Sequence, residues 1–228
     1  MLTGIIGAMA VETDAIKSMI CDPVTEKVGS IEFVRGNIRG NDVVVAQCGI
    51  GKVFAAICAE AMILKYAPDR IINTGVAGTL SEELGLLDVA VSSSVVEHDM
   101  DTSPLGDPVG LISGINIINI PASDNLVSDI LAAAERIGKK CVSGVIASGD
   151  QFIADREKKN EIKDRFSAIA CEMEGAAIGQ VCYVNGVDFA IIRSISDNAD
   201  DRAGSMDYPE LCQKAAEQSE KLLMELLK

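Results

Sequence analysis

The stretch DFAIIRSISD, residues 188–197, decides most of what can be predicted about the fold of this chain. Its short apolar run is rich in isoleucine and bounded by polar residues, which is typical of a buried β-strand. The predicted strand contains Arg193 and ends on Ser196 and Asp197. A carboxylate is therefore expected at the carboxyl end of a buried strand.

Around this strand, short apolar runs alternate with segments of helical periodicity. Further strands are expected within residues 3–9, 70–78, 88–99 and 141–150, and two strands joined by a tight turn within residues 31–49. Helices are expected within residues 10–20, 52–67, 123–138, 156–166, 174–186 and 208–228. The alternation predicts an α/β protein with a layered, largely parallel sheet. No linker or repeat interrupts it, so residues 1–228 are interpreted as one domain.

The chain has 228 residues and a formal net charge of −14. Binding to nucleic acid or to anionic lipid needs a surplus of Lys and Arg, so both are disfavoured and a small-molecule enzyme is expected. The sequence shows neither a signal peptide nor an apolar run of the roughly 20 residues that a membrane-spanning helix needs. Seven cysteines, an odd number without a C-x-x-C pair, indicate a reduced, cytoplasmic protein.

Motifs that suggest a cofactor or a metal are incomplete. Gly49 and Gly51 begin a dinucleotide-binding pattern, but Phe54 stands where the third Gly or Ala is required. A phosphate-binding loop is disfavoured because valine, and not Ser or Thr, follows the GK pair at 51–52. His98 has two acids nearby in HDMD, which is poor geometry for a metal site. We expect no cofactor and no metal.

Four carboxylates stand out because apolar or small residues surround them: Glu12, Glu172, Glu174 and Asp197. An acid at the start of a helix is also explained as a cap, and this alternative is strongest for Glu12. Ligands of α/β sheets bind beyond the carboxyl ends of strands, where Asp197 is expected. Several carboxylates with Arg193 and no metal suit acid–base cleavage of a glycosidic-type bond. The role of Glu172 stays open between site and structure.

Six motifs resemble, in their order and spacing, the nucleoside phosphorylase family: GIIGAM followed by Glu12, CGIGKV, INTGVAG, SGDQFI, CEMEGAAI and RSISDNAD. Within it they most resemble the bacterial 5'-methylthioadenosine/S-adenosylhomocysteine nucleosidases, over nearly the whole chain. The resemblance implies a three-layer αβα sandwich with a mixed central β-sheet. It also implies hydrolysis of the N-glycosidic bond of these nucleosides, which releases adenine and a 5-thio-substituted ribose.

The resemblance implies a role for each acid of the site. Glu12 is expected to activate the attacking water, with Arg193 nearby. Asp197, oriented by Ser196, is expected to protonate N7 of adenine, and Glu174 to bind both ribose hydroxyls. Carboxylates beside the ribose stabilise the cationic character that it acquires as the bond breaks.

The resemblance also implies the walls of the pocket. Phe152 is expected to stack on adenine, while the backbone of Ile153 reads the edge of the base. Met9 and Ile50 are expected on the ribose and 5' side, and the backbone of Met173 beside the ribose. The remaining pocket residues that it implies are Ala8, Val76, Gly78 and Met206.

A homodimer is implied as well, in which Thr102 and Leu105 of one subunit reach the pocket of the other. Two departures concern specificity. Val76 stands where many nucleosidases have Ser, and Met206 replaces an aromatic residue near the 5' side, so the preferred 5' substituent stays open.

Water is expected to be the acceptor, although alternatives remain. Related phosphorylases grip phosphate with an Arg and a Ser at the positions of Asn73 and Val76, and Glu12 would repel that anion. The alternatives are a nucleosidase for another adenine nucleoside such as 6-amino-6-deoxyfutalosine, a purine nucleoside phosphorylase, and a non-catalytic nucleoside-binding protein. A nicotinamide-dependent reductase is disfavoured by Phe54.

Overall fold

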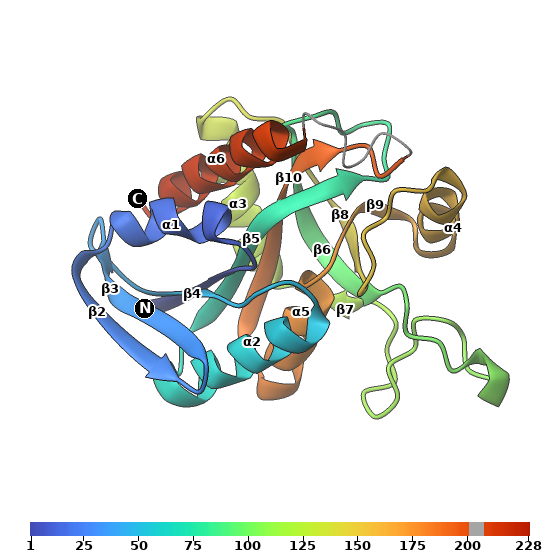
Figure 1. The fold of residues 1–228 in the computed structure, drawn as a ribbon, viewed down its shortest axis with the longest axis horizontal. Coiled ribbons are helices and arrows are strands. Elements are labelled where there is room, and N and C mark those ends of the chain that lie inside the picture. The colour runs from blue at the N-terminus through green and yellow to red at the C-terminus, as the bar shows by residue number, and fades with distance from the viewer. Residues whose placement is uncertain (201–207) are drawn as a thin grey trace.

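The computed structural model describes residues 1–200 and 208–228, and Figure 1 shows a twisted sheet between two groups of helices. The strands are β1 (Leu2–Gly7), β2 (Cys21–Val28), β3 (Ile31–Ile38), β4 (Asn41–Gln47), β5 (Arg70–Thr79), β6 (Val89–Glu97), β7 (Ile120–Pro121), β8 (Cys141–Ser148), β9 (Ala168–Glu172) and β10 (Asp188–Asp197). The helices are α1 (Ala10–Ser18), α2 (Lys52–Tyr66), α3 (Asp124–Arg136), α4 (Arg156–Phe166), α5 (Gly175–Asn185) and α6 (Tyr208–Leu226), with a short 3₁₀ turn, η1 (Ser103–Leu105).

Three layers result from the way the helices pack. α6 contacts both α1 and α3, and these three helices cover one face of the sheet, while α2 and α5 pack together on the other face (Figure 1). The predicted α/β sandwich with a mixed central sheet is confirmed. In the described ranges, no helix is both long and apolar enough to cross a membrane.

The sheet is more mixed than the alternation of strands and helices predicts. β4, β1, β5 and β10 run parallel, but β10 pairs with β6 and β5 pairs with β9 in antiparallel fashion. The largely parallel sheet expected from the sequence pattern is therefore wrong. β10 contacts both β5 and β6, and the path through β8 and β9 returns to β5, so these five strands close on themselves.

Three strands, β2, β7 and β9, were not predicted from the sequence pattern. β7 has only two residues. β2 is an edge strand that is almost wholly exposed and contains Pro23, so it lacks the apolar alternation that marks a strand. β9 has only five residues. Its pairing of Cys171 with Gly78 brings the end of β9 to the end of β5, which is where the candidate site forms.

Candidate active site

A cavity opens where the loops after β1, β4, β5, β8, β9 and β10 meet. Its walls combine apolar side chains with carboxylates from distant parts of the chain. The lining residues are Ala8, Met9, Glu12, Ile50, Val76, Ala77, Gly78, Gln151, Phe152, Ile153, Cys171, Glu172, Met173, Glu174, Ser196, Asp197 and Tyr208.

Asp197 forms one end of the cavity, at the carboxyl end of β10. Its Oδ2 accepts a hydrogen bond of 2.9 Å from Ser196 Oγ, and its Oδ1 accepts one of 2.8 Å from the backbone N–H of Ala199. Burial raises the pKa of Asp197, and these two hydrogen bonds oppose that rise only in part. This carboxyl is therefore suited to carry a proton into a reaction.

Glu12 lies at the other end, in the first turn of α1. Its Oε2 accepts from the backbone N–H groups of Ala8 (2.8 Å) and Met9 (3.0 Å), so it caps its own helix. Its Oε1 reaches across to the N–H of Val76 (3.2 Å) on β5. Burial raises the pKa of Glu12, and the charge of Arg193 opposes the rise. Glu12 therefore both caps α1 and lines the cavity.

Glu174 faces the cavity from the start of α5. Its Oε1 accepts a hydrogen bond of 2.8 Å from Gly51 N–H, whereas its Oε2 is 3.8 Å from Arg193 Nη2. Burial and the neighbouring charge of Glu172 raise the pKa of Glu174 to about 7. One oxygen of this carboxylate is thus loosely held and available to a ligand.

Arg193 does not line the cavity but lies behind it, fully buried in β10. Its Nη2 donates to Glu172 Oε2 and to Asn73 Oδ1, and its Nη1 donates to the backbone carbonyl of Ile192. The guanidinium therefore supplies positive charge to a group of carboxylates, Glu12 among them, without an open face toward the cavity.

Glycines on β5 make room for these groups. A Cβ atom on Gly75 would lie 2.7 Å from Glu12 Oε1 and 3.1 Å from Arg193 Nη1. A Cβ atom on Gly78 would lie 2.8 Å from Asp197 Oδ1. The two glycines of the INTGVAG motif thus serve close side-chain approach, one at each end of the cavity.

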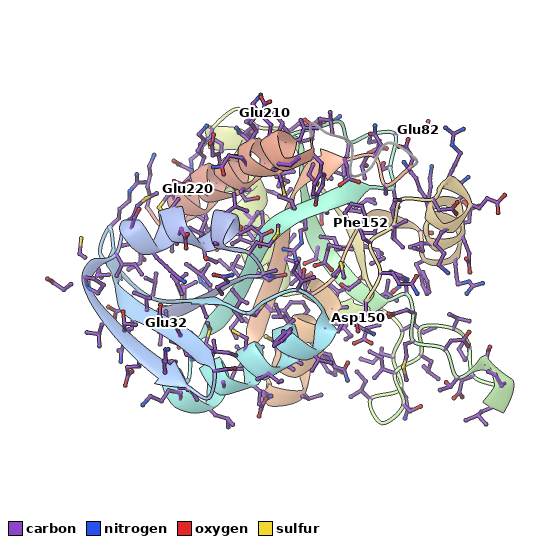
Figure 2. All side chains as sticks on the ribbon, in the orientation of Figure 1. Glu32, Glu82, Asp150, Phe152, Glu210 and Glu220 are labelled. Carbon is purple, nitrogen blue, oxygen red and sulfur yellow. The ribbon has the colours of Figure 1, made fainter. Side chains whose placement is uncertain are left out.

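The rim is apolar and partly exposed. Phe152, on the loop after β8 (Figure 2), is half exposed, and its ring lies edge-on to Tyr208 with centroids 5.7 Å apart. Ile50 is also half exposed, while Ile153 is buried. An aromatic side chain with a free face at the mouth of a cavity is suited to stack on a planar ring.

The structure gathers most of the expected pocket residues but not all. Thr102 and Leu105 lie near or within η1, on the segment that extends away from the body (Figure 1), and neither lines the cavity. Met206 lies outside the described residues. The lining residues that sequence reasoning did not assign to the site are Ala77, Gln151, Cys171, Glu172 and Tyr208. Tyr208 had a usable signal, since it is an aromatic residue two positions after Met206, which the resemblance implied as a pocket residue.

The HDMD motif contributes to structure. Asp99 and Glu97 each accept a hydrogen bond of 2.8 Å from Lys52 Nζ, and Asp99 also accepts from the N–H of Asp150. His98 is buried beside Gly149. No group of three His, Cys, Asp or Glu side chains that could hold a metal occurs within residues 1–200 and 208–228.

Comparison with known proteins identifies the family. Residues 3–228 match the model of the phosphorylase superfamily. A 5'-methylthioadenosine/S-adenosylhomocysteine nucleosidase of Shewanella halifaxensis is 41% identical over 100% of this chain and 99% of its own.

Solved structures are similar along the whole chain. The same kind of nucleosidase from Neisseria meningitidis, in complex with methylthio-immucillin-A, has a TM-score of 0.95 and 32% identity, covering 100% of this chain and 98% of its own. A futalosine hydrolase of Helicobacter pylori has a TM-score of 0.93 and 34% identity, covering 99% and 96%. The chain belongs to the phosphorylase superfamily and, within it, to the family of the 5'-methylthioadenosine/S-adenosylhomocysteine nucleosidases.

Proposed function

We propose that this protein hydrolyses the N-glycosidic bond of 5'-methylthioadenosine and S-adenosylhomocysteine, releasing adenine and a 5-thio-substituted ribose. The observation that carries the proposal is the convergence of Glu12, Glu174 and Asp197 on one cavity, with Arg193 behind it. The substrates are those in the names of the Shewanella and Neisseria relatives.

At the base end, Asp197 gives its proton to N7 of adenine as the bond to C1' breaks. Adenine leaves poorly as an anion, so protonation at N7 lowers the barrier. An unperturbed Asp has a pKa of roughly 3.9, and the burial of Asp197 raises it toward the pH at which the proton is needed. Ser196 orients this carboxyl, Phe152 stacks on the base, and the backbone of Ile153 reads its edge.

At the ribose end, Glu174 binds the two hydroxyls and Glu12 removes a proton from the attacking water. Both carboxylates lie beside the ribose, which becomes cationic as adenine departs, so both stabilise the transition state. The backbone of Met173 borders the ribose, and Met9 and Ile50 form the apolar wall for the 5' substituent.

Water is favoured over phosphate as the acceptor. Asn73, at the position where related phosphorylases carry an Arg, is fully buried and occupied: its Oδ1 accepts from Arg193 and its Nδ2 donates to the carbonyl of Ile6 (2.8 Å). Val76 supplies no hydroxyl, and the carboxylate of Glu12 would repel a dianion. These features leave no evident cradle for phosphate among the described lining residues.

The test is the identity of the sugar product. The protein is incubated with 5'-methylthioadenosine or S-adenosylhomocysteine, with and without phosphate, and the products are separated by chromatography. We expect adenine and free 5-thio-substituted ribose at the same rate in both buffers. A sugar 1-phosphate would show a phosphorylase, and the absence of adenine release would show a binding protein.

A second candidate substrate is 6-amino-6-deoxyfutalosine, because the chain is also similar to a futalosine hydrolase. This substrate shares the adenine and ribose parts and differs at the 5' position. Ile50 at the rim is half exposed, so the 5' end of the cavity is open to larger groups. Comparing kcat/KM for the three nucleosides decides between them: a value for the futalosine derivative more than tenfold above both thionucleosides would reverse the assignment.

We also infer that the protein is a homodimer through the face formed by α2 and α5. Large apolar side chains are exposed on this face, and a groove of apolar residues runs beside them. The exposed members are Val53, Phe54, Ile57, Leu64, Tyr183 and Val184. Contiguous exposed apolar surface marks an interaction site. Leu105, 85% exposed on the extended segment, is suited to reach the rim of a second copy's pocket.

Oligomeric state and activity test this inference together. Ile57→Glu introduces a charge into the α2–α5 face and is expected to give monomers by light scattering, with at least tenfold lower kcat/KM. Leu86→Glu is the matched control, because it changes an exposed leucine outside that face and should remain dimeric and active. A wild-type protein that is monomeric at micromolar concentration would overturn the dimer.

We further infer that residues 1–228 act as one domain in the cytoplasm. All of the loops that line the cavity extend from a single sheet. The seven cysteines are free thiols, which agrees with a reducing compartment.

A further inference from the structure

Glu172 is a buried carboxylate that the mechanism above does not use. It accepts hydrogen bonds from Ser148 Oγ and from Arg193 Nη2. It also accepts from the backbone N–H of Glu174 (3.0 Å) and from that of Gly175 (2.8 Å to Oε2 and 3.0 Å to Oε1). Because four protein groups already donate hydrogen bonds to the carboxylate of Glu172, its oxygens have little capacity left for a ligand.

These donors come from three different elements. Ser148 ends β8, Arg193 lies in β10, and Glu174 and Gly175 begin α5. Ser148 Oγ in turn accepts from the N–H of Ala176 (2.7 Å), so Glu172 and Ser148 together occupy the first free N–H groups of α5. The pair thereby fixes the backbone from which the side chain of Glu174 points into the cavity.

In the same arrangement, Arg193 lies closer to Glu172 than to Glu174. Its Nη2 is in direct contact with Glu172 but 3.8 Å from Glu174 Oε2. A guanidinium held by Glu172 cannot close on Glu174 as well, so Glu174 keeps an oxygen available. We propose that Glu172 is a positioning residue: it anchors Arg193 and the start of α5 so that Glu174 stays free to bind a diol. The diol as ligand rests on the function proposed above.

The charge of Glu172 also acts on Glu174 directly. The other titratable groups that face Glu174 are Arg193 from β10, Glu12 from α1 and Cys48 after β4. Replacing Glu172 by an uncharged residue removes one negative neighbour and frees Arg193 to approach Glu174. Both changes favour the ionised form of Glu174, so its pKa falls. A purely structural role for Glu172 predicts no such fall.

The substitution Glu172→Gln removes the negative charge of this side chain but keeps its size and shape. Its amide oxygen can accept from Arg193 and the start of α5, while its NH₂ group can donate to Ser148 Oγ, so the fold is expected to persist. Because Arg193 then competes with the ligand for Glu174, we expect KM at pH 8 to rise about tenfold with kcat within threefold. The rise in KM below neutral pH should begin at least half a pH unit lower than in the wild type. Unchanged KM and an unchanged pH profile would overturn the proposal.

Two further variants keep the proposal testable. Glu225→Gln is the matched control, since it removes the charge of a carboxylate on α6 that pairs with Arg136 of α3 and with Lys228, and its kinetics should equal those of the wild type. Ser148→Ala removes the anchor of Glu172 but keeps its charge. We expect a KM about threefold higher with the wild-type pH profile, and an unchanged KM would count against the proposal if Glu172→Gln does not fold.

A titration that needs no turnover distinguishes failure of this proposal from failure of the proposed function. Glutamate carboxyl carbons are labelled with ¹³C, and the signal of Glu174 is assigned by its loss in Glu174→Gln. The inflection should move to lower pH in Glu172→Gln whether or not the wild type releases adenine. Identical inflections in the two proteins would overturn the proposal, whereas a wild type without adenine release would affect the proposed function alone.

Discussion

The two ends of the cavity hold carboxylates in opposite electrostatic settings. At the base end, Asp197 stands in a mainly apolar environment with one hydroxyl and one backbone N–H as partners. At the ribose end, Glu12, Glu172 and Glu174 share the single guanidinium of Arg193. Burial raises the pKa of Asp197, and among the described residues Lys159 is the cation that opposes this rise, whereas at Glu12 the charge of Arg193 opposes it.

This difference supports the opposite tasks that are proposed for these similar side chains. A general acid must hold a proton until the leaving group needs it, and a base or a counter-charge must be ionised beforehand. Burial raises the pKa of both Asp197 and Glu12, but at Glu12 the charge of Arg193 counteracts part of that rise. Variants at either end of the cavity test this difference.

Removing the proton donor is expected to have the largest effect. Asp197→Asn keeps the shape of the side chain but supplies no acidic proton, so adenine release should fall by about a hundred- to ten-thousand-fold. Substrate binding, measured by calorimetry, should change by less than threefold. Because burial raises the pKa of Asp197, its ionised form destabilises the folded state as pH rises through that pKa, so the variant should unfold at the same or a higher temperature. Substantial residual turnover would show that the proton comes from elsewhere.

Crowding the ribose end is expected to reduce turnover by a smaller factor. Gly75→Ala introduces a Cβ atom where Glu12 Oε1 and Arg193 Nη1 now approach the backbone, so these groups must move apart. Displacement of reacting groups by about 1 Å can reduce turnover about a hundredfold, and we expect a fall of that order in kcat. Gly85→Ala is the control, since its Cβ would meet nothing closer than 3.6 Å. Equal activity of the two variants would show that the reaction does not need the space beside Gly75.

The pH dependence of substrate binding tests whether Glu174 must be ionised at the ribose end. Since the pKa of Glu174 is raised to about 7, this carboxylate is ionised above that value and protonated below it. A protonated Glu174 offers fewer acceptors to the ribose hydroxyls. KM should therefore be constant above pH 8 and rise toward about tenfold per unit well below pH 7. Initial rates from pH 5 to pH 9 check this, and a KM that is flat to pH 5 would contradict it.

The smallest effect is expected at the rim. Tyr208→Phe keeps the ring that lies edge-on to Phe152 and removes only the hydroxyl, so kcat/KM should change by less than threefold. Tyr208→Ala removes the ring contact, which is worth about 0.5–1.5 kcal/mol, so KM should rise about three- to tenfold. A larger effect of the phenylalanine variant would mean that the hydroxyl contacts the substrate.

The strands and helices with clear periodicity were predictable, because the buried face of each element appears in its own sequence. The edge strand β2 was not, since an exposed strand with Pro23 has no such pattern. The mixed direction of the sheet was also hidden from the local pattern, and only the family resemblance implied it. Strand direction depends on pairings such as that of Cys171 with Gly78, which lie far apart in the sequence.

The acids of the site were predictable as a group, but their partners were not. Glu172 and Glu174 stand two residues apart in similar surroundings, and neither position reveals which one meets Arg193. The structure separates them: Glu172 accepts from four donors, whereas Oε2 of Glu174 is held loosely, 3.8 Å from Arg193 Nη2. That distinction arises from Ser148, which no local pattern connects to Glu172.

The proposed mechanism depends on protonation of adenine at N7, and a modified substrate tests this step without altering the protein. The 7-deaza analogue of 5'-methylthioadenosine carries a C–H group in place of N7 and therefore cannot accept the proton of Asp197. Rates of base release from the two nucleosides are compared under saturating conditions, after binding of the analogue has been verified by calorimetry. We expect the analogue to bind with similar affinity and to lose its base at least a hundredfold more slowly. Cleavage of both nucleosides at comparable rates would contradict the role of Asp197.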